Sequence, residues 1–219
     1  MGIAVAAAIV VFAGFAPSYF LKGYYGSPSL SPLVHAHGLA FTAWIALFFT
    51  QTVLIANGQR SVHRKLGAAG ACLAAIMVVL GVAAAVGAIR SNHTPPGIDP
   101  RSFLVLVFFD IAVFAILVGA GVPFRGQPET HKRLMLLATI AMLDAPIARL
   151  PGIFALGPLV SFGLQDMFLL AGIGYDLLLR RRVERAYVFG GLLILLSQPL
   201  RLFVSGTPWW LAFGDWIKG

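Results

Sequence analysis

Gly58-Gln59, followed by His63-Arg64-Lys65-Leu66, opens a long apolar run of this chain. Gly126-Gln127, followed by His131-Lys132-Arg133-Leu134, opens a second apolar run 68 residues later. An apolar run that crosses a bilayer core of ~30 Å needs roughly 20 residues in helical form. Each stretch therefore places one histidine at an equivalent start of a membrane helix.

The composition of the whole chain agrees with a membrane protein. Of its 219 residues, 59% are hydrophobic and only 11% are charged, too few charges to cover a soluble surface. The apolar runs show no alternation of polarity, which argues against a barrel of strands. We therefore predict an all-α fold, a polytopic transmembrane bundle that forms a single domain over residues 1–219, with about seven helices at 3–21, 34–56, 66–89, 102–122, 132–149, 156–179 and 187–205.

The spacing of 68 residues corresponds to about one helical hairpin. Helices 2–3 and 4–5 are therefore predicted to be two copies of one unit in the same orientation, a parallel repeat of the kind found in transporters. In each copy a good N-cap residue precedes the helix, Ser61 in the first and Thr130 in the second.

The distribution of basic residues predicts a cytoplasmic N-terminus and a periplasmic C-terminus. Residues 207–219, rich in tryptophan, are predicted to form an amphipathic tail in the outer interface. The net charge of +8 is spread over loops, so the expected partner is the lipid bilayer and not nucleic acid. With this orientation, ten of the sixteen Lys and Arg residues lie on the inner side: Arg60, Arg64, Lys65, Arg125, Lys132, Arg133, Arg180, Arg181, Arg182 and Arg185.

The histidines at helix boundaries are the candidate cofactor ligands. An imidazole in the first turn of a helix meets the positive end of the helix dipole, which favours the neutral form that ligates metals. His63 could share a cofactor with His131 on the inner side, and His35 or His37 with an outer partner such as His93. His37 and His63 lie about 30 Å apart along the bundle and cannot share one. The alternative is that His63 and His131 only anchor their helices to lipid phosphates.

Polar residues inside the apolar runs form a second candidate site near the outer side. His37, Trp44 and Gln51 share one face of helix 2, because they are seven residues apart. Asp110, Asp144 and Asp166 are expected at a similar depth in the membrane. Three carboxylates so close together cannot all stay charged unless they bind a metal together with His37, hold at least one proton, or are neutralised by arginine. The neutralising pairs expected are Asp144 with Arg149, or Asp166 with Arg201. The full set of expected polar residues is Asp110, Asp144, Arg149, Gln165, Asp166, Gln198 and Arg201.

The motifs Val34-His35-Ala36-His37-Gly38, His63-Arg64-Lys65-Leu66-Gly67 and His131-Lys132-Arg133-Leu134-Met135, within about the first 150 residues, resemble a family of small uncharacterised bacterial inner-membrane proteins with several passes. That resemblance implies a bacterial inner membrane and no settled activity. A looser likeness is to membrane b-type cytochromes, which place haem between histidines of neighbouring helices. Two functions are therefore expected: binding of haem b or a metal ion for electron or proton transfer, or a transporter or accessory subunit of a membrane complex with a polar Asp/Arg pocket.

Overall fold

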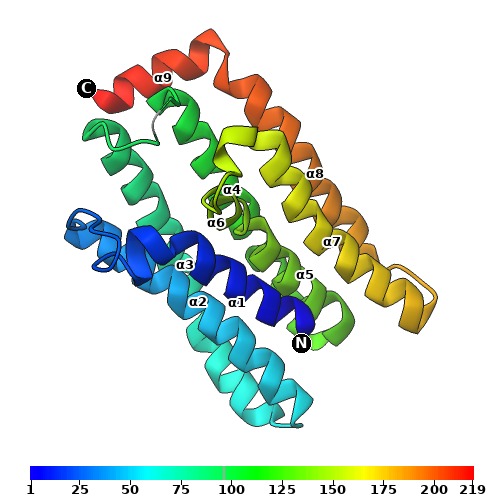
Figure 1. Ribbon diagram of the computed structural model, residues 1–219. Coiled ribbons are helices and arrows are strands. Elements are labelled where there is room, and N and C mark those ends of the chain that lie inside the picture. Colours follow the sequence, from blue (N-terminus) through cyan, green and yellow to red (C-terminus); the bar gives the residue numbers. More distant parts are fainter. Residues whose placement is uncertain (96) are drawn as a thin grey trace.

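The computed structural model describes residues 1–95 and 97–219, and these residues form helices and connections with no strand. Figure 1 shows the helices as one bundle. A π-helix, Ala16–Phe20, continues the first helix, and two short 3-10 helices, Pro123–Gly126 and Phe154–Leu156, lie in connections. The α-helices are α1 (Gly2–Phe15), α2 (Pro32–Ala56), α3 (Arg60–Arg90), α4 (Pro100–Gly121), α5 (Pro128–Ala141), α6 (Asp144–Ala148), α7 (Pro158–Arg180), α8 (Arg185–Ser205) and α9 (Pro208–Lys218).

Six helices in the described part of the chain are long and apolar enough to cross a membrane. They are α1 with its π-helical extension, α2, α3, α4, α7 and α8, and α3 is the longest at 31 residues. Such lengths are what a bilayer core requires of a crossing helix. The prediction of an all-α polytopic bundle is confirmed, and the chain is a membrane protein.

The predicted helix 132–149 is not continuous, which corrects the sequence interpretation. It is divided into α5 and the five-residue α6. Between them Met142 N donates to Thr139 O and Leu143 N to Ile140 O, so the chain tightens where an α-helix would continue. Pro146 has no N–H to return to Met142, and its ring disfavours an unbroken helix there. The predicted helix 132–149 therefore consists of two shorter helices with a tight turn between them.

The two helical hairpins of the repeat are α2 with α3 and α4 with α5, each pair packed along its length. Their second helices begin earlier than predicted, with Gln59 and Gln127 at the N-cap positions. The prediction of caps at Ser61 and Thr130 is therefore wrong, and both residues lie inside the first turn. The copies also differ in length, because the break shortens α5 to 14 residues.

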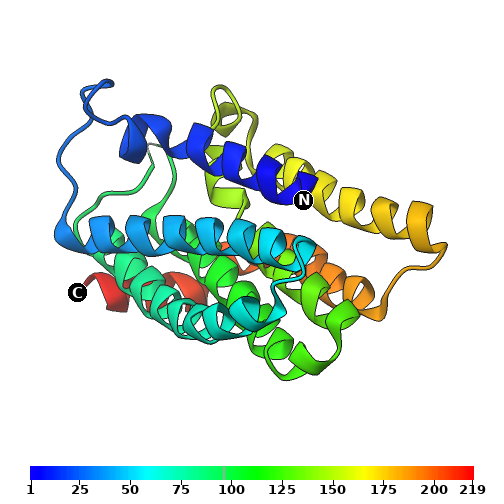
Figure 2. The same ribbon diagram turned by 90° about the horizontal axis from the view of Figure 1, so that it is seen from below.

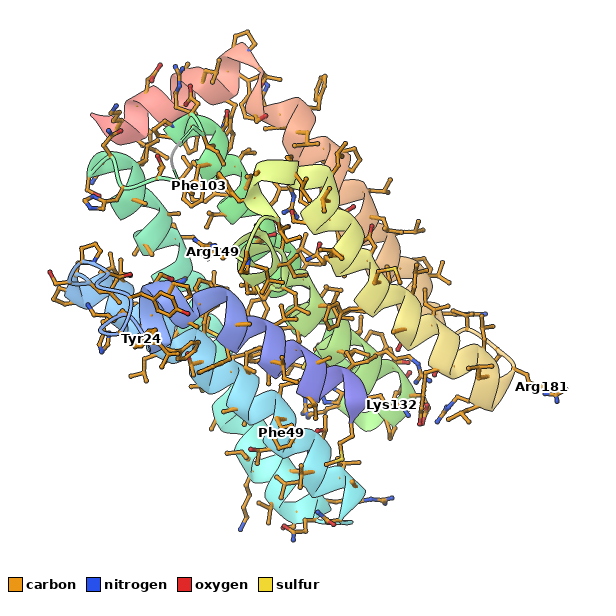
Figure 3. The ribbon with its side chains drawn as sticks, viewed as in Figure 1. Tyr24, Phe49, Phe103, Lys132, Arg149 and Arg181 are labelled. Carbon is orange, nitrogen blue, oxygen red and sulfur yellow. The ribbon has the colours of Figure 1, made fainter. Side chains whose placement is uncertain are left out.

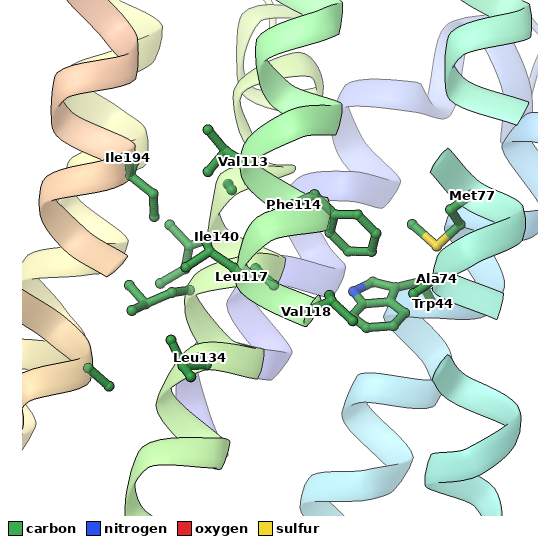
Figure 4. Packing of buried hydrophobic residues seen from close by; sticks show 14 of the residues in the cluster. Trp44, Ala74, Met77, Val113, Phe114, Leu117, Val118, Leu134, Ile140 and Ile194 are labelled. Carbon is green, nitrogen blue, oxygen red and sulfur yellow. The ribbon is translucent and has the colours of Figure 1, made fainter. Parts of the chain in front are cut away.

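The bundle has two layers, which are visible in the view turned by 90° (Figure 2). In that view α1 and α7 lie above the remaining long helices. The core lies between α2, α3, α4, α5 and α8 (Figure 4). There Trp44 and Phe114 meet edge to face with ring centres 5.0 Å apart, and Met77 is 1% exposed. In a membrane, close packing of this kind replaces the hydrophobic effect as the force that holds helices together.

Helix α1 reaches α6 through Gly14, where a Cβ atom would collide with the backbone carbonyl of Pro146. We expect Gly14→Ala to separate α1 from α6 and to lower the midpoint of thermal unfolding in detergent, because backbone atoms cannot yield as a side chain can. Gly119→Ala is the matched control, since no atom lies within 4 Å of its Cβ position. An unchanged midpoint for Gly14→Ala would contradict the contact.

Helix α9 corresponds to the predicted tail 207–219 and lies against the ends of α3 and α4. Arg90 Nε donates to the carbonyl of Ile217 at 2.8 Å, and the Trp210 indole donates to the carbonyl of Arg101 at 2.8 Å. Arg101 also pairs with Asp215 and with Asp99, and its hydrogen bonds hold the pKa of the Asp99 carboxyl below the ordinary value. These contacts join α9 to both helices.

Candidate functional site: a cavity with two histidines

The starts of α3 and α5 and the end of α7 lie at one end of the bundle, which we call the basic end, towards the lower right of Figure 1. Lys132 and Arg181, labelled in Figure 3, lie at this end. An ion pair between Glu129 at the start of α5 and Arg180 at the end of α7 shows that the two helix ends meet. The opposite end, where α9 crosses α3 and α4, is called the α9 end.

A cavity of about 590 Å³ opens at the basic end, and we call it the histidine cavity. This volume is typical of sites for cofactors and small ligands. Residues from both hairpins and from α1 and α7 line it, and most of its wall is apolar. Its lining includes Ile3, Trp44, Gly70, Met135, Gly172 and Tyr175, together with both repeat histidines.

The structure brings the two repeat histidines together. The ring centres of His63 and His131 are 6.4 Å apart, and the rings are nearly perpendicular. His131 Nδ1 lies 2.8 Å from the carbonyl oxygen of Gly121, so this nitrogen is the one that carries the proton when the ring is neutral. The other nitrogen, Nε2, then has its lone pair free to ligate.

Gln51 of α2 fixes the other side of the histidine cavity. Its Nε2 donates to the backbone carbonyl of His63 at 3.2 Å, which ties α2 to the first turn of α3. The Oε1 atom of Gln51 and the Nδ1 atom of His63 are buried and have no hydrogen-bond partner among the described residues. Buried polar atoms without partners are costly, and both atoms belong to residues that line the cavity, where a bound group could satisfy them.

A buried ion-pair network closes the cavity on the α5 side. Arg133, 2% exposed, donates two hydrogen bonds of 2.6 Å to the carboxylate of Asp176 on α7. It also donates to Glu129 at 2.7 Å, and its guanidinium lies 5.7 Å from the ring centre of Tyr187. Sequence reasoning overlooked Asp176 as a site residue, although a carboxylate within a predicted membrane helix was a sufficient signal.

The polar residues predicted near the outer side gather around Arg201 of α8. Arg201 Nη1 lies 2.6 Å from Asp110 Oδ1 and 3.7 Å from Asp144 Oδ2, and all three residues are buried. Asp166 instead accepts a hydrogen bond of 2.8 Å from Gln198. The expected pairs of Asp144 with Arg149 and Asp166 with Arg201 are therefore wrong, because Arg201 turns towards α4 and α6.

Gln165 of α7 hydrogen-bonds to the backbone at the end of α5, where the helix is interrupted. Its Nε2 donates to the carbonyls of Ile140 and Ala141, both at 3.0 Å. The Ile140 carbonyl also accepts from Leu143 N, whereas Ala141 lies where a continuing helix would supply the donor, and no water in a bilayer core could replace it. Gln198 also donates to Gln165 Oε1 at 3.3 Å, so the polar residues of α7 and α8 form one network.

The remaining predicted residues lie apart from the histidine cavity. His37 contacts Phe41, with ring centres 4.2 Å apart, and His35 is exposed beside Tyr19. The exposed His93 follows α3, and its Nδ1 atom lies 3.1 Å from the Ser91 carbonyl oxygen, so its contact is not with His35 or His37, the partners proposed for it. Arg149, near the centre of Figure 3, donates to the carbonyl of Ala145 and lies over the ring of Phe15 at 4.9 Å.

Among residues 1–95 and 97–219, no three side chains of His, Cys, Asp or Glu gather as the ligands of one metal ion. The predicted metal ligands have different neighbours: Asp110 and Asp144 lie beside Arg201, Asp166 is bonded to Gln198, and His37 packs on Phe41. What the structure does assemble is a pair of imidazoles beside an apolar cavity.

No family model, no curated protein and no solved structure matches this chain.

Proposed function

We propose that this membrane protein binds haem b between His63 and His131 and serves in electron transfer. The distance between the two rings carries the proposal. A metal ion held at ~2.0–2.1 Å by one nitrogen of each ring needs ring centres roughly 6 Å apart. The separation of 6.4 Å fits this arrangement.

The number of ligands favours a porphyrin over a bare ion. A structural zinc site takes four protein ligands and a catalytic one takes three, whereas a haem iron needs only axial ligands from the protein. Among the described residues, the two imidazoles have no third His, Cys, Asp or Glu placed to ligate the same ion, since Asp176 of the cavity wall is bound to Arg133. The porphyrin would supply one-electron redox chemistry, and the apolar wall of the histidine cavity would exclude water from it.

The residues around the histidines hold their rings in place. Gly121 orients His131 through its carbonyl, and Gln51 fixes the backbone of His63. A Cβ atom on Gly121 would collide with Met135, so the absence of a side chain there lets the start of α5 approach α4. Groups that hold metal ligands in this way fix the orientation of the ligand rings and adjust their basicity. The distribution of basic residues favours an orientation with the basic end in the cytoplasm. The bacterial inner membrane is what the resemblance of the histidine motifs implies.

The test is a haemin titration of the protein purified in detergent, followed by an absorption spectrum. We expect a Soret band that saturates at one haem per chain. His63→Ala and His131→Ala should each reduce the affinity for haem more than about tenfold, because even the loss of a residue that only hydrogen-bonds to a metal ligand often has an effect of that size. The double variant should be no worse than either single one. His35→Ala and His93→Ala are matched controls at the other end of the bundle.

A wild-type protein that stays colourless with haemin would contradict the proposal. So would a spectrum that neither His63→Ala nor His131→Ala changes. The first result would return attention to the transporter or accessory-subunit alternative and its Asp/Arg residues. Size-exclusion profiles of the variants separate loss of binding from loss of folding.

A further inference from the structure

The break between α5 and α6 places Asp144 in a buried cluster with Asp110 and Arg201. The three side chains come from α6, α4 and α8, so the cluster joins three helices. Asp144 is 7% exposed and its Oδ1 atom has no hydrogen-bond partner among the described residues. A carboxylate oxygen left this way inside a membrane bundle is among the most costly groups a protein can hold.

Arg201 cannot neutralise both carboxylates. Its Nη1 makes a contact of 2.6 Å with Asp110, whereas Asp144 lies at 3.7 Å, beyond hydrogen-bond distance. Nη2 donates to Ser197 Oγ at 3.0 Å and Nε to the Ser197 carbonyl at 3.3 Å. The guanidinium is thus committed to Asp110 and Ser197, and it makes no hydrogen bond to Asp144.

The other polar groups near Asp144 make their hydrogen bonds to other atoms. Arg149, the residue after the same short helix, is near enough for its charge to act on Asp144, but it donates to the Ala145 carbonyl, lies over Phe15 and forms no ion pair within the described chain. The Ser161 hydroxyl of α7 lies beside Asp144 and donates to Pro158 O at 3.0 Å. Asp166 of α7 is held by Gln198, and His37 of α2 packs on Phe41. Among the described residues, the Asp144 Oδ1 atom therefore has no hydrogen-bond donor.

We propose that Asp144 is a proton-binding site, in which its carboxyl group holds one proton while Asp110 stays ionised against Arg201. The proton removes the charge from a buried carboxylate that no side chain of the cluster hydrogen-bonds. Sites of this kind, formed where a membrane helix is interrupted, are how many transporters hold protons and ions near the bilayer midplane. Release of the proton would leave a charge that draws Arg201 away from Asp110, which couples the site to the packing of α8. This site is independent of the histidine cavity.

The test is infrared spectroscopy of the purified protein at neutral pH in H₂O and D₂O. We expect the C=O stretch of a protonated carboxylic acid in wild-type protein, with the shift that deuterium exchange produces. Asp144→Asn should remove the band and still fold, because the amide matches the shape and charge of the protonated acid. Asp166→Asn is the matched control and should retain the band.

Asp110→Asn provides a second and opposite test. It frees Arg201 to pair with Asp144, so Asp144 should ionise and the band should disappear although the Asp144 side chain is present. This variant decides the question if Asp144→Asn fails to fold. A wild-type spectrum without the band, or a band that survives in Asp144→Asn or in Asp110→Asn, would overturn the proposal.

Discussion

Replacing Arg133 with methionine is expected to lower the free energy of unfolding by about 3–5 kcal/mol. The change leaves Asp176, whose side chain is 3% exposed, without the two hydrogen bonds that hold it between α5 and α7. Glu129 keeps Lys132 and Arg180, so the loss falls mainly on Asp176. Reversible unfolding in mixed micelles, followed by tryptophan fluorescence, measures the difference.

Lys132→Met is the matched control, because the Lys132 side chain is 51% exposed and its pair with Glu129 contributes at most about 1 kcal/mol. A second variant separates the charge from the packing. In Arg133→Met with Asp176→Leu, no charge is stranded, and most of the lost stability should return. If the double variant is as unstable as the two single changes together, the pair is not the cause.

Gln165→Leu is expected to lower the free energy of unfolding by about 1–3 kcal/mol, since it leaves the Ala141 carbonyl without its hydrogen-bond donor in the interior of the bundle. The Ile140 carbonyl, to which Gln165 also donates, keeps the hydrogen bond from Leu143 N. Gln51→Leu is the matched control: it removes one hydrogen bond to a carbonyl, and such bonds between membrane helices average only about 0.6 kcal/mol. The same unfolding assay compares them, and equal losses would show that Gln165 is not a special cap.

The long helices could be predicted from sequence because the length of an apolar run directly reports a membrane crossing. The break in α5 could not, although Pro146 was visible. Pro199 lies inside α8, and that helix continues past it. A proline in a membrane helix therefore permits a break without requiring one, and the outcome depends on whether a neighbour such as Gln165 can satisfy the freed carbonyls.

The candidate site, like the fold, could be predicted from the sequence only in part. Equivalent positions in two repeated hairpins indicated that His63 and His131 occupy the same level, and the structure places their rings side by side. The partners of the aspartates were not predictable, since they depend on how each helix is rotated about its axis. A rotation of one residue, about 100°, turns Arg201 from Asp110 and Asp144 towards another helix.

Helix α9 contacts the end of α3 that lies farthest from the histidine cavity. Arg90, bonded to the carbonyl of Ile217, lies at one end of α3, and His63 lies in its first turn at the other, about 40 Å away at ~1.5 Å per residue. A tilt of only about 1.5° around the α9 contacts would move His63 by about 1 Å relative to His131. We therefore expect that a substitution in α9 that shifts its contact with Arg90 changes the distance between the two imidazoles without touching the cavity.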